Sequence, residues 1–197
     1  MKTITLQNPE KLVFGTGCFD QMIDDLLLSG KKRLYILTIP ILATSIRLKF
    51  EKIASQGVEF QINDSLNCEP AFLHFYQFMD DAIAFDPDGV IGIGGGSVLD
   101  MAKLLAAFIG NEQKIEDVVG IGLLRKRMLY LACLPTTSGT GSEVSPNSIL
   151  LDERDGMKKG IISPCLVPDA AYIDPLLTMG IPSEITASTG IDALTHC

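Results

Sequence analysis

Three short apolar runs, each typical of a buried β-strand, alternate with helical patterns along the first 134 residues. The runs are residues 33–38 (RLYILT), 89–93 (GVIGI) and 128–134 (MLYLACL). Strands that are apolar on both faces suit a parallel sheet with helices on both sides. Residues 19–28, 42–54 and 71–85 space their apolar side chains as amphipathic helices do. The alternation predicts an α/β fold built on a doubly wound parallel sheet.

The pattern changes after residue 134. Residues 148–152 and 157–163 are short strand-like runs, and the Asp155-Gly156 pair between them favours a hairpin turn because both residue types tolerate positive φ. A helix-start composition follows from Pro182 and is still running at the last residue, Cys197. We therefore expect an α/β domain over residues 1–180 and the truncated start of a helical domain over 181–197, in a fragment of a longer protein.

The overall charge excludes two classes of partner. A net charge of -8 gives no positive field for nucleic acid or anionic lipid, so we expect neither partner. No secretory signal opens the chain, and no apolar stretch reaches the ~18 residues of a membrane helix, so we expect a cytoplasmic protein. Five cysteines without a CxxC pair predict reduced thiols, with neither a disulfide framework nor a thiolate zinc site.

Residues 92–103 (GIGGGSVLDMAK) carry the strongest local motif, in which a strand runs through three glycines into a helix. Free N–H groups and the positive dipole end of such a helix suit a pyrophosphate, which makes Gly95, Gly96, Ser97 and Asp100 candidates for binding it. The spacing is not GxGxxG, because the last glycine required falls on Ser97. A structural alternative stays open: Ser97 with Asp100 could form a capping box, with the glycines merely turning the chain.

A second polar loop, residues 135–143 (PTTSGTGSE), follows another strand. Its small hydroxyl side chains could wrap a phosphate or ribose, and the candidates are Thr136, Thr137, Thr140 and Ser142. The alternative is an ordinary hydrophilic connection. Ligands bind at the carboxyl ends of strands in open α/β sheets, so both loops should meet over one ligand.

Asp192 and His196 lie four residues apart in GIDALTHC, which places them on one face of a helix. A carboxylate and an imidazole in this arrangement can bind a divalent metal such as iron or zinc. The alternative is structural, since an acidic residue near a helix start is favoured by the helix dipole.

These segments together, in this order, resemble the iron-containing (group III) alcohol dehydrogenases. GGGSVLDMAK is similar to the family's diphosphate loop, PTTSGTGSE to its second nucleotide loop and TGIDALTH to its first metal-ligand helix. The resemblance implies a Rossmann-like, dehydroquinate synthase-like N-terminal domain that binds NAD or NADP, and an all-helical domain that holds Fe²⁺ or Zn²⁺. It also implies hydride transfer between an alcohol or aldehyde and the nucleotide, in a homodimer or higher homo-oligomer.

Carried onto this chain, the resemblance assigns diphosphate contacts to Gly96 and Ser97 and nucleotide contacts to the four hydroxyl residues of the second loop. Lys158 matches a cofactor-contacting lysine, although Lys159 offers a second register. Asp192 and His196 would be two of four metal ligands, and the other two, with the catalytic residues, would lie beyond Cys197 in a longer protein.

One departure from the family concerns the choice between NAD and NADP. Many NAD-using members carry an aspartate after the strand that here ends at Thr38, where this chain has Ile39 and Pro40. Without that carboxylate the choice between NAD and NADP stays open.

Two alternatives for the function also stay open. One is a maleylacetate reductase, dehydroquinate synthase or glycerol dehydrogenase-like branch of the superfamily, and the other is a non-catalytic nucleotide-binding module. PTTSGTGSE with DALTH favours the alcohol dehydrogenase branch.

Overall fold

The structure, a computed structural model, describes residues 6–66 and 68–196. Cys197 lies outside the described residues. The strands are β1 Lys11–Phe14, β2 Arg33–Leu37, β3 Glu59–Asn63, β4 Gly89–Gly94, β5 Gly120–Ile121, β6 Tyr130–Pro135, β7 Asn147–Asp152, β8 Met157–Ile162 and β9 Ala170–Ile173. The α-helices are α1 Cys18–Leu28, α2 Pro40–Ala54, α3 Phe72–Phe85, α4 Gly96–Phe108 and α5 Ser183–Thr195. Short 3-10 turns span η1 Ile115–Val118, η2 Pro164–Leu166 and η3 Pro175–Leu177.

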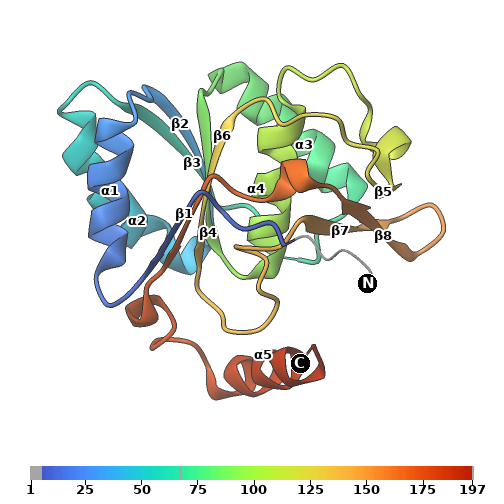
Figure 1. The fold of residues 1–197 in the computed structure, drawn as a ribbon. Helices are drawn as coiled ribbons and strands as arrows, with labels where there is room; N and C mark the ends of the chain where they lie inside the picture. Colours follow the sequence, from blue (N-terminus) through green and yellow to red (C-terminus); the bar gives the residue numbers. More distant parts are fainter. Residues whose placement is uncertain (1–5, 67, 197) are drawn as a thin grey trace.

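Six strands form one sheet in the order β1-β9-β6-β4-β2-β3, and every pair in it is parallel. Helices α1 and α2 cover one face of this sheet, and α3 and α4 cover the other (Figure 1). The predicted doubly wound α/β fold is confirmed. Parallel strands run in one direction, so the loops after β2, β4 and β6 meet at a single edge of the sheet.

The apolar strand residues divide between two cores, one on each face. In β2, Tyr35 and Leu37 pack with α3 and α4, whereas Leu34 and Ile36 pack with α1 and α2. Side chains alternate between the faces of a strand, so a strand buried on both faces must be apolar at every position. This requirement explains the continuous apolar runs in the sequence.

Three strands of the main sheet escaped the sequence analysis. β1 is a four-residue edge strand with every second residue exposed, and β9 is a four-residue strand. β3, at the opposite edge, has the mixed sequence EFQIN and is only partly buried. β1 and β3 have one solvated side, so they lack the apolar signal that identified β2, β4 and β6. β9 lies inside the sheet, between β1 and β6, but its run AAYI is short and half alanine, a residue type depleted in strands.

A second sheet of three strands, in the order β5-β8-β7, lies beside α4 (Figure 1). β7 and β8 pair antiparallel, as the hairpin signal predicted. Gly156 closes the hairpin with φ of 68°, and its N–H donates to the carbonyl of Asp152 at 2.8 Å. A residue with a side chain rarely adopts this φ, which accounts for the glycine.

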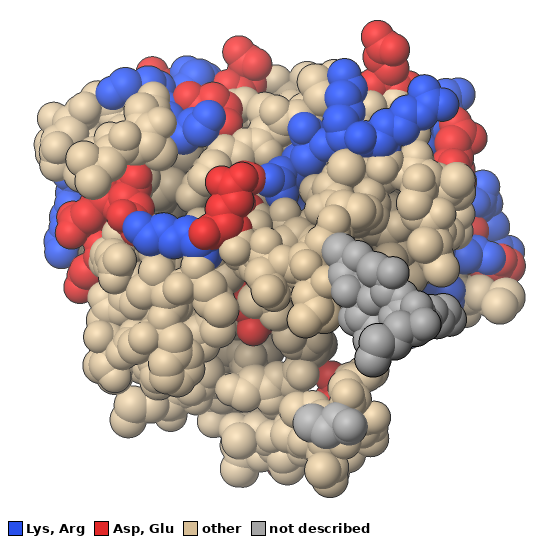
Figure 2. All heavy atoms as spheres, viewed as in Figure 1, with Lys and Arg blue, Asp and Glu red and all other residues tan. Residues whose placement is uncertain are grey.

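Helix α5 lies apart from the two cores, below the carboxyl ends of the strands (Figure 1). It begins after Pro182, where the sequence predicts a helix, and none of its residues is buried. Figure 2 shows charged side chains of both signs over the upper part of the molecule, and few of them around α5. Within residues 6–66 and 68–196, no helix is long and apolar enough to cross a membrane.

Candidate functional site

The first glycine-rich segment joins β4 to α4. β4 ends at Gly94, Gly95 is the N-cap residue, and the helix begins at Gly96. Ser97 is therefore the second helical residue, and the cap makes no side-chain hydrogen bond. The capping-box alternative is wrong because the serine lies inside the helix. The Val98 and Leu99 N–H groups donate to the Gly95 carbonyl at 3.0 and 3.1 Å. The N–H groups of Gly96 and Ser97 come before them at the open end of the helix, as an anion site requires.

The second loop lies directly against the first. The Thr136 N–H donates to the carbonyl of Gly94 at 3.0 Å, which continues the β4–β6 pairing into the loops. A Cβ placed on Gly96 would lie 2.8 Å from the Thr140 Cγ2 and 2.9 Å from its Oγ1. The close approach of the loops thus depends on the absence of a side chain at residue 96.

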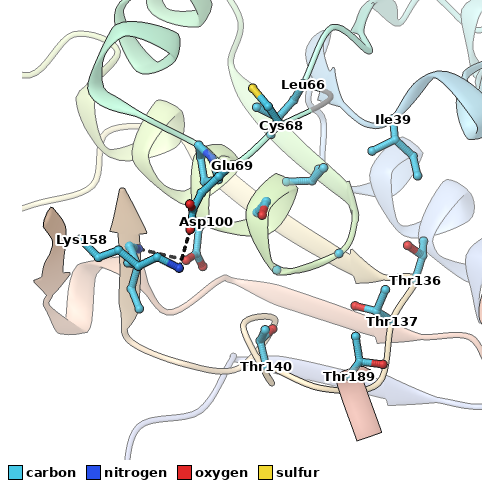
Figure 3. A pocket seen from close by; sticks show the side chains of 16 residues that line it. Ile39, Leu66, Cys68, Glu69, Asp100, Thr136, Thr137, Thr140, Lys158 and Thr189 are labelled. Atoms are coloured by element: carbon cyan, nitrogen blue, oxygen red, sulfur yellow. Dashed lines mark hydrogen bonds and ion pairs between the residues drawn. The ribbon is translucent and has the colours of Figure 1, made fainter. Parts of the chain in front are cut away.

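Both loops line one cavity of about 670 Å³. This volume falls within the range of roughly 300–1,000 Å³ that is usual for small-molecule and cofactor sites. In Figure 3 the threonines lie along one side of the cavity, and Leu66 and Cys68 lie along the other. Eight residues named from the sequence line it: Gly95, Gly96, Ser97, Asp100, Thr136, Thr137, Thr140 and Lys158.

Ser142, the ninth candidate, is buried behind the cavity instead of lining it. Its hydroxyl donates to the Asp100 carboxylate, and the other Asp100 oxygen accepts the Ile149 N–H at 3.0 Å. The Ser142 hydroxyl in turn accepts from the Lys103 amine at 2.8 Å. Ser142 therefore connects the second loop to α4.

Lys103 is a central residue that the sequence analysis missed. Its side chain is fully buried, and besides Ser142 its amine donates to the Asn147 carbonyl at 2.9 Å and shares its third proton between the two oxygens of Ser145, each at 3.1 Å. Asp100 lies 3.7 Å away. Burial lowers the pKa of Lys103 and raises that of Asp100, while the attraction between the two opposes both shifts. This network fixes the end of the second loop to the buried helix.

Lys158, on β8, lines the cavity and forms an ion pair with Glu69. The neighbouring Lys159 is paired with Asp155. The structure therefore favours the register in which Lys158, and not Lys159, faces the candidate site. Glu69 belongs to a third loop, described over residues 64–66 and 68–71, which follows β3 and contributes Leu66, Cys68 and Pro70 to the cavity. Recognising β3 would have pointed to this loop.

Two further lining residues come from outside these loops. Ile39 follows β2, at the position where many NAD-using members of the resembled family have an aspartate, and it lines the cavity with an apolar side chain. Thr189 reaches the cavity from α5. Thr189 is the first residue of the motif TGIDALTH, so it could have been named from the sequence. Only Asp192 and His196 were selected from that motif, as candidate metal ligands.

Asp192 and His196 do lie together on α5, with 3.5 Å between the Asp192 Oδ1 and the His196 Nε2. Both side chains are accessible, at 42% and 73% of full exposure. Among the described residues no group of three His, Cys, Asp or Glu side chains could hold a metal. The pair offers one oxygen and one nitrogen donor, which is half of a four-ligand set.

The four described cysteines are free thiols, as expected from their spacing. Burial raises the pKa of Cys133 to about 12, which keeps that thiol protonated and unreactive.

Comparison with known proteins identifies the family. The family model for iron-containing alcohol dehydrogenases matches residues 9–175. The chain is 34% identical to sulfoacetaldehyde reductase of Bilophila wadsworthia over 95% of its length, and 36% identical to long-chain-alcohol dehydrogenase 1 of Geobacillus thermodenitrificans over 92%. The protein belongs to the iron-containing alcohol dehydrogenase family. It covers 49% and 47% of these two relatives, so the chain spans about half the length of the curated relatives it matches.

Solved structures support the same family. A crystal structure of 1,3-propanediol oxidoreductase superposes with a TM-score of 0.91 at 26% identity, covering 99% of this chain and 52% of that one. Sulfoacetaldehyde reductase from Bifidobacterium kashiwanohense, in complex with NAD⁺, gives a TM-score of 0.86 at 28% identity, covering 98% and 51%. The Rossmann-like α/β fold is thus that of the N-terminal domain in this family.

Proposed function

We propose that this chain is the nucleotide-binding part of a metal-dependent alcohol dehydrogenase that transfers hydride between an alcohol or aldehyde and NAD(P). One observation carries the proposal: eight of the residues selected from the sequence line a single cavity at the carboxyl edge of the sheet. The expected division at residue 180, the homo-oligomeric state and the cytoplasmic location remain predictions.

The cavity fits a dinucleotide. Small hydroxyl side chains and the first turn of α4 lie together, so the diphosphate would sit against the N–H groups of Gly96 and Ser97. Thr137 and Thr140 would donate to its oxygens or to a ribose. Lys158 would lie near a ribose or phosphate oxygen and would bind it in addition to, or in place of, the Glu69 carboxylate. Asp100, partly buried at the inner wall of the cavity, would fix a polar group of the nucleotide.

The metal fits only in part. Asp192 and His196 could supply two ligands to Fe²⁺ or Zn²⁺, and the remaining ligands would have to come from elsewhere. When bound, the nicotinamide would supply hydride chemistry and the metal Lewis acidity toward the alcohol oxygen. The protein would hold both groups at the distance and orientation that the reaction requires, and it would exclude water. We therefore infer that the 197 residues alone bind nucleotide, hold metal weakly and do not turn over.

Titration calorimetry with NAD(H) and NADP(H) tests nucleotide binding. A Gly96→Val variant should bind at least about a hundredfold more weakly, about 2.7 kcal/mol, because its Cβ pushes into Thr140. Gly180→Val is the matched control, since a Cβ there meets nothing within 4 Å, and it should bind as the unchanged protein does. Absence of binding from folded protein with either nucleotide would contradict the proposal.

Turnover tests the enzymatic part. The chain is assayed with Fe²⁺ or Zn²⁺, either nucleotide and a panel of primary alcohols, beside a longer chain that includes any downstream histidines. We expect activity only in the longer chain. Equal turnover by the 197 residues would contradict our placement of the metal site. Nucleotide binding without turnover in the longer chain would support the non-catalytic module instead.

A further inference from the structure

The second loop and α5 come into close contact at Gly139 and Thr189. A Cβ placed on Gly139 would lie 2.9 Å from the Thr189 Cβ, 3.0 Å from its carbonyl oxygen and 3.2 Å from its Cα. Two of these three atoms belong to the backbone, so a smaller side chain at residue 189 would not relieve the contact. The approach is therefore possible only with glycine at position 139.

This contact joins two parts of the site. Thr137 and Thr140 flank Gly139 and line the cavity, and so does Thr189 on the other side of the contact. Asp192 follows Thr189 by three residues, about one turn along the same helix face. In Figure 3 Thr189 lies next to the second loop, below Thr137. The same helix thus touches the nucleotide loop and carries the two candidate metal donors.

The two partners are held very differently. The second loop is fixed three residues before Gly139, where Thr136 bonds to Gly94, and three residues after it, where Ser142 bonds to Lys103 and Asp100. α5 has no buried residue. A side chain added at residue 139 would therefore displace α5 and leave the loop in place.

We propose that Gly139 is a positioning residue, which holds α5 against the second loop so that nucleotide binding also orders the helix carrying Asp192 and His196. The idea rests on the proposed function, because it uses nucleotide binding at the cavity. It predicts that the metal-ligand helix and the nucleotide are coupled through this contact, without Gly139 touching either the substrate or the metal.

The test is amide hydrogen exchange of the 197-residue chain, comparing Gly139→Ala with Gly190→Ala. Neither glycine has a left-handed φ, so alanine introduces no backbone strain at either position. At Gly190, on α5 next to Thr189, a Cβ meets nothing within 4 Å. The control thus adds the same methyl group to the same contact region, but without the collision.

Without nucleotide, Gly139→Ala should speed exchange in residues 183–195 about fivefold or more, while Gly190→Ala leaves it unchanged or slower. Equal exchange in Gly139→Ala and the unchanged chain would overturn the proposal. This comparison does not depend on ligand, so it decides the role of Gly139 even if the proposed function fails.

With saturating NAD⁺, the unchanged chain should show slower exchange in α4, in residues 136–142 and in α5. At a nucleotide concentration a hundred times the Kd, linkage limits this effect to about a hundredfold. In Gly139→Ala the first two segments should still be protected and α5 should not. Protection of α5 in that variant would overturn the coupling, whereas no protection anywhere in the unchanged chain would overturn the nucleotide site itself.

Discussion

Helices α4 and α5 both have 13 residues and both contribute to the candidate site, yet they are held in opposite ways. Ten residues of α4 are buried, and the helix packs against β4, β6, β7 and α3, whereas α5 has no buried residue. The start of α4 is therefore fixed by the core before any ligand arrives. α5 carries the two candidate metal donors but has no buried residue to hold it against the core. Isolated helices of this length have only marginal stability in water. The proposed nucleotide half of the site is therefore preorganised, and the proposed metal half is not.

The largest effect should come from the buried amine that ties α4 to the second loop. Lys103→Met should lower the free energy of unfolding by about 3–5 kcal/mol, because the Asp100 carboxylate, whose side chain is only 15% exposed, would lose its cation. Lys126→Met, at an exposed position, is the control and should change stability by less than about 0.5 kcal/mol. Urea denaturation measures both. A loss below about 1 kcal/mol in Lys103→Met would show that this network does not anchor the loop.

A matched pair of leucines tests the comparison of the helices directly. Leu104→Ala, at a fully buried position of α4, should cost about 2–5 kcal/mol of stability. Leu194→Ala, at a position of α5 that is 74% exposed, should cost less than about 0.5 kcal/mol. Similar losses in the same urea experiment would mean that α5 is packed as firmly as α4.

The sequence predicted the interior of the fold better than its edges. β2, β4 and β6 are buried on both faces, so their apolar residues are continuous and easy to recognise. β1 and β3 lie at the edges and carry mixed residues, so no local pattern separates them from loops. Their identity depends on the partner strand, which a single sequence does not display.

The position of the candidate cavity was predictable where small residues follow a strand. Gly96 and Thr137 belong to such loops, and the rule on strand ends brought them together correctly. Lys103 was missed because a lysine in a helical pattern suggests a solvated face, and only the fold reveals the oxygens that surround it. Ser142 was selected as a nucleotide contact because its hydroxyl is equivalent, in sequence, to those of the neighbouring threonines, although it does not line the cavity.

The smallest effect expected is discrimination between NAD and NADP. Ile39 lines the cavity after β2 and offers no carboxylate to bind a ribose hydroxyl or repel a 2′-phosphate. The ratio of the two Kd values, measured by calorimetry, should therefore stay well below a thousandfold, or about 4 kcal/mol. A larger preference for NAD would require an acidic group near the ribose. The Ile39→Asp variant measures how far such a group shifts the ratio of the two Kd values toward NAD.

The central claim is that the nucleotide site is complete without the metal half. Calorimetric titration of the 197-residue chain with NADH, once with a chelator and once with Zn²⁺, tests it most directly. We predict one nucleotide bound per chain in both solutions, because most of the residues that line the cavity are held by the core and not by α5. Zn²⁺ can act on the nucleotide only through α5, so by linkage it should tighten the Kd by less than about tenfold. Binding that appears only when Zn²⁺ is present would contradict the claim.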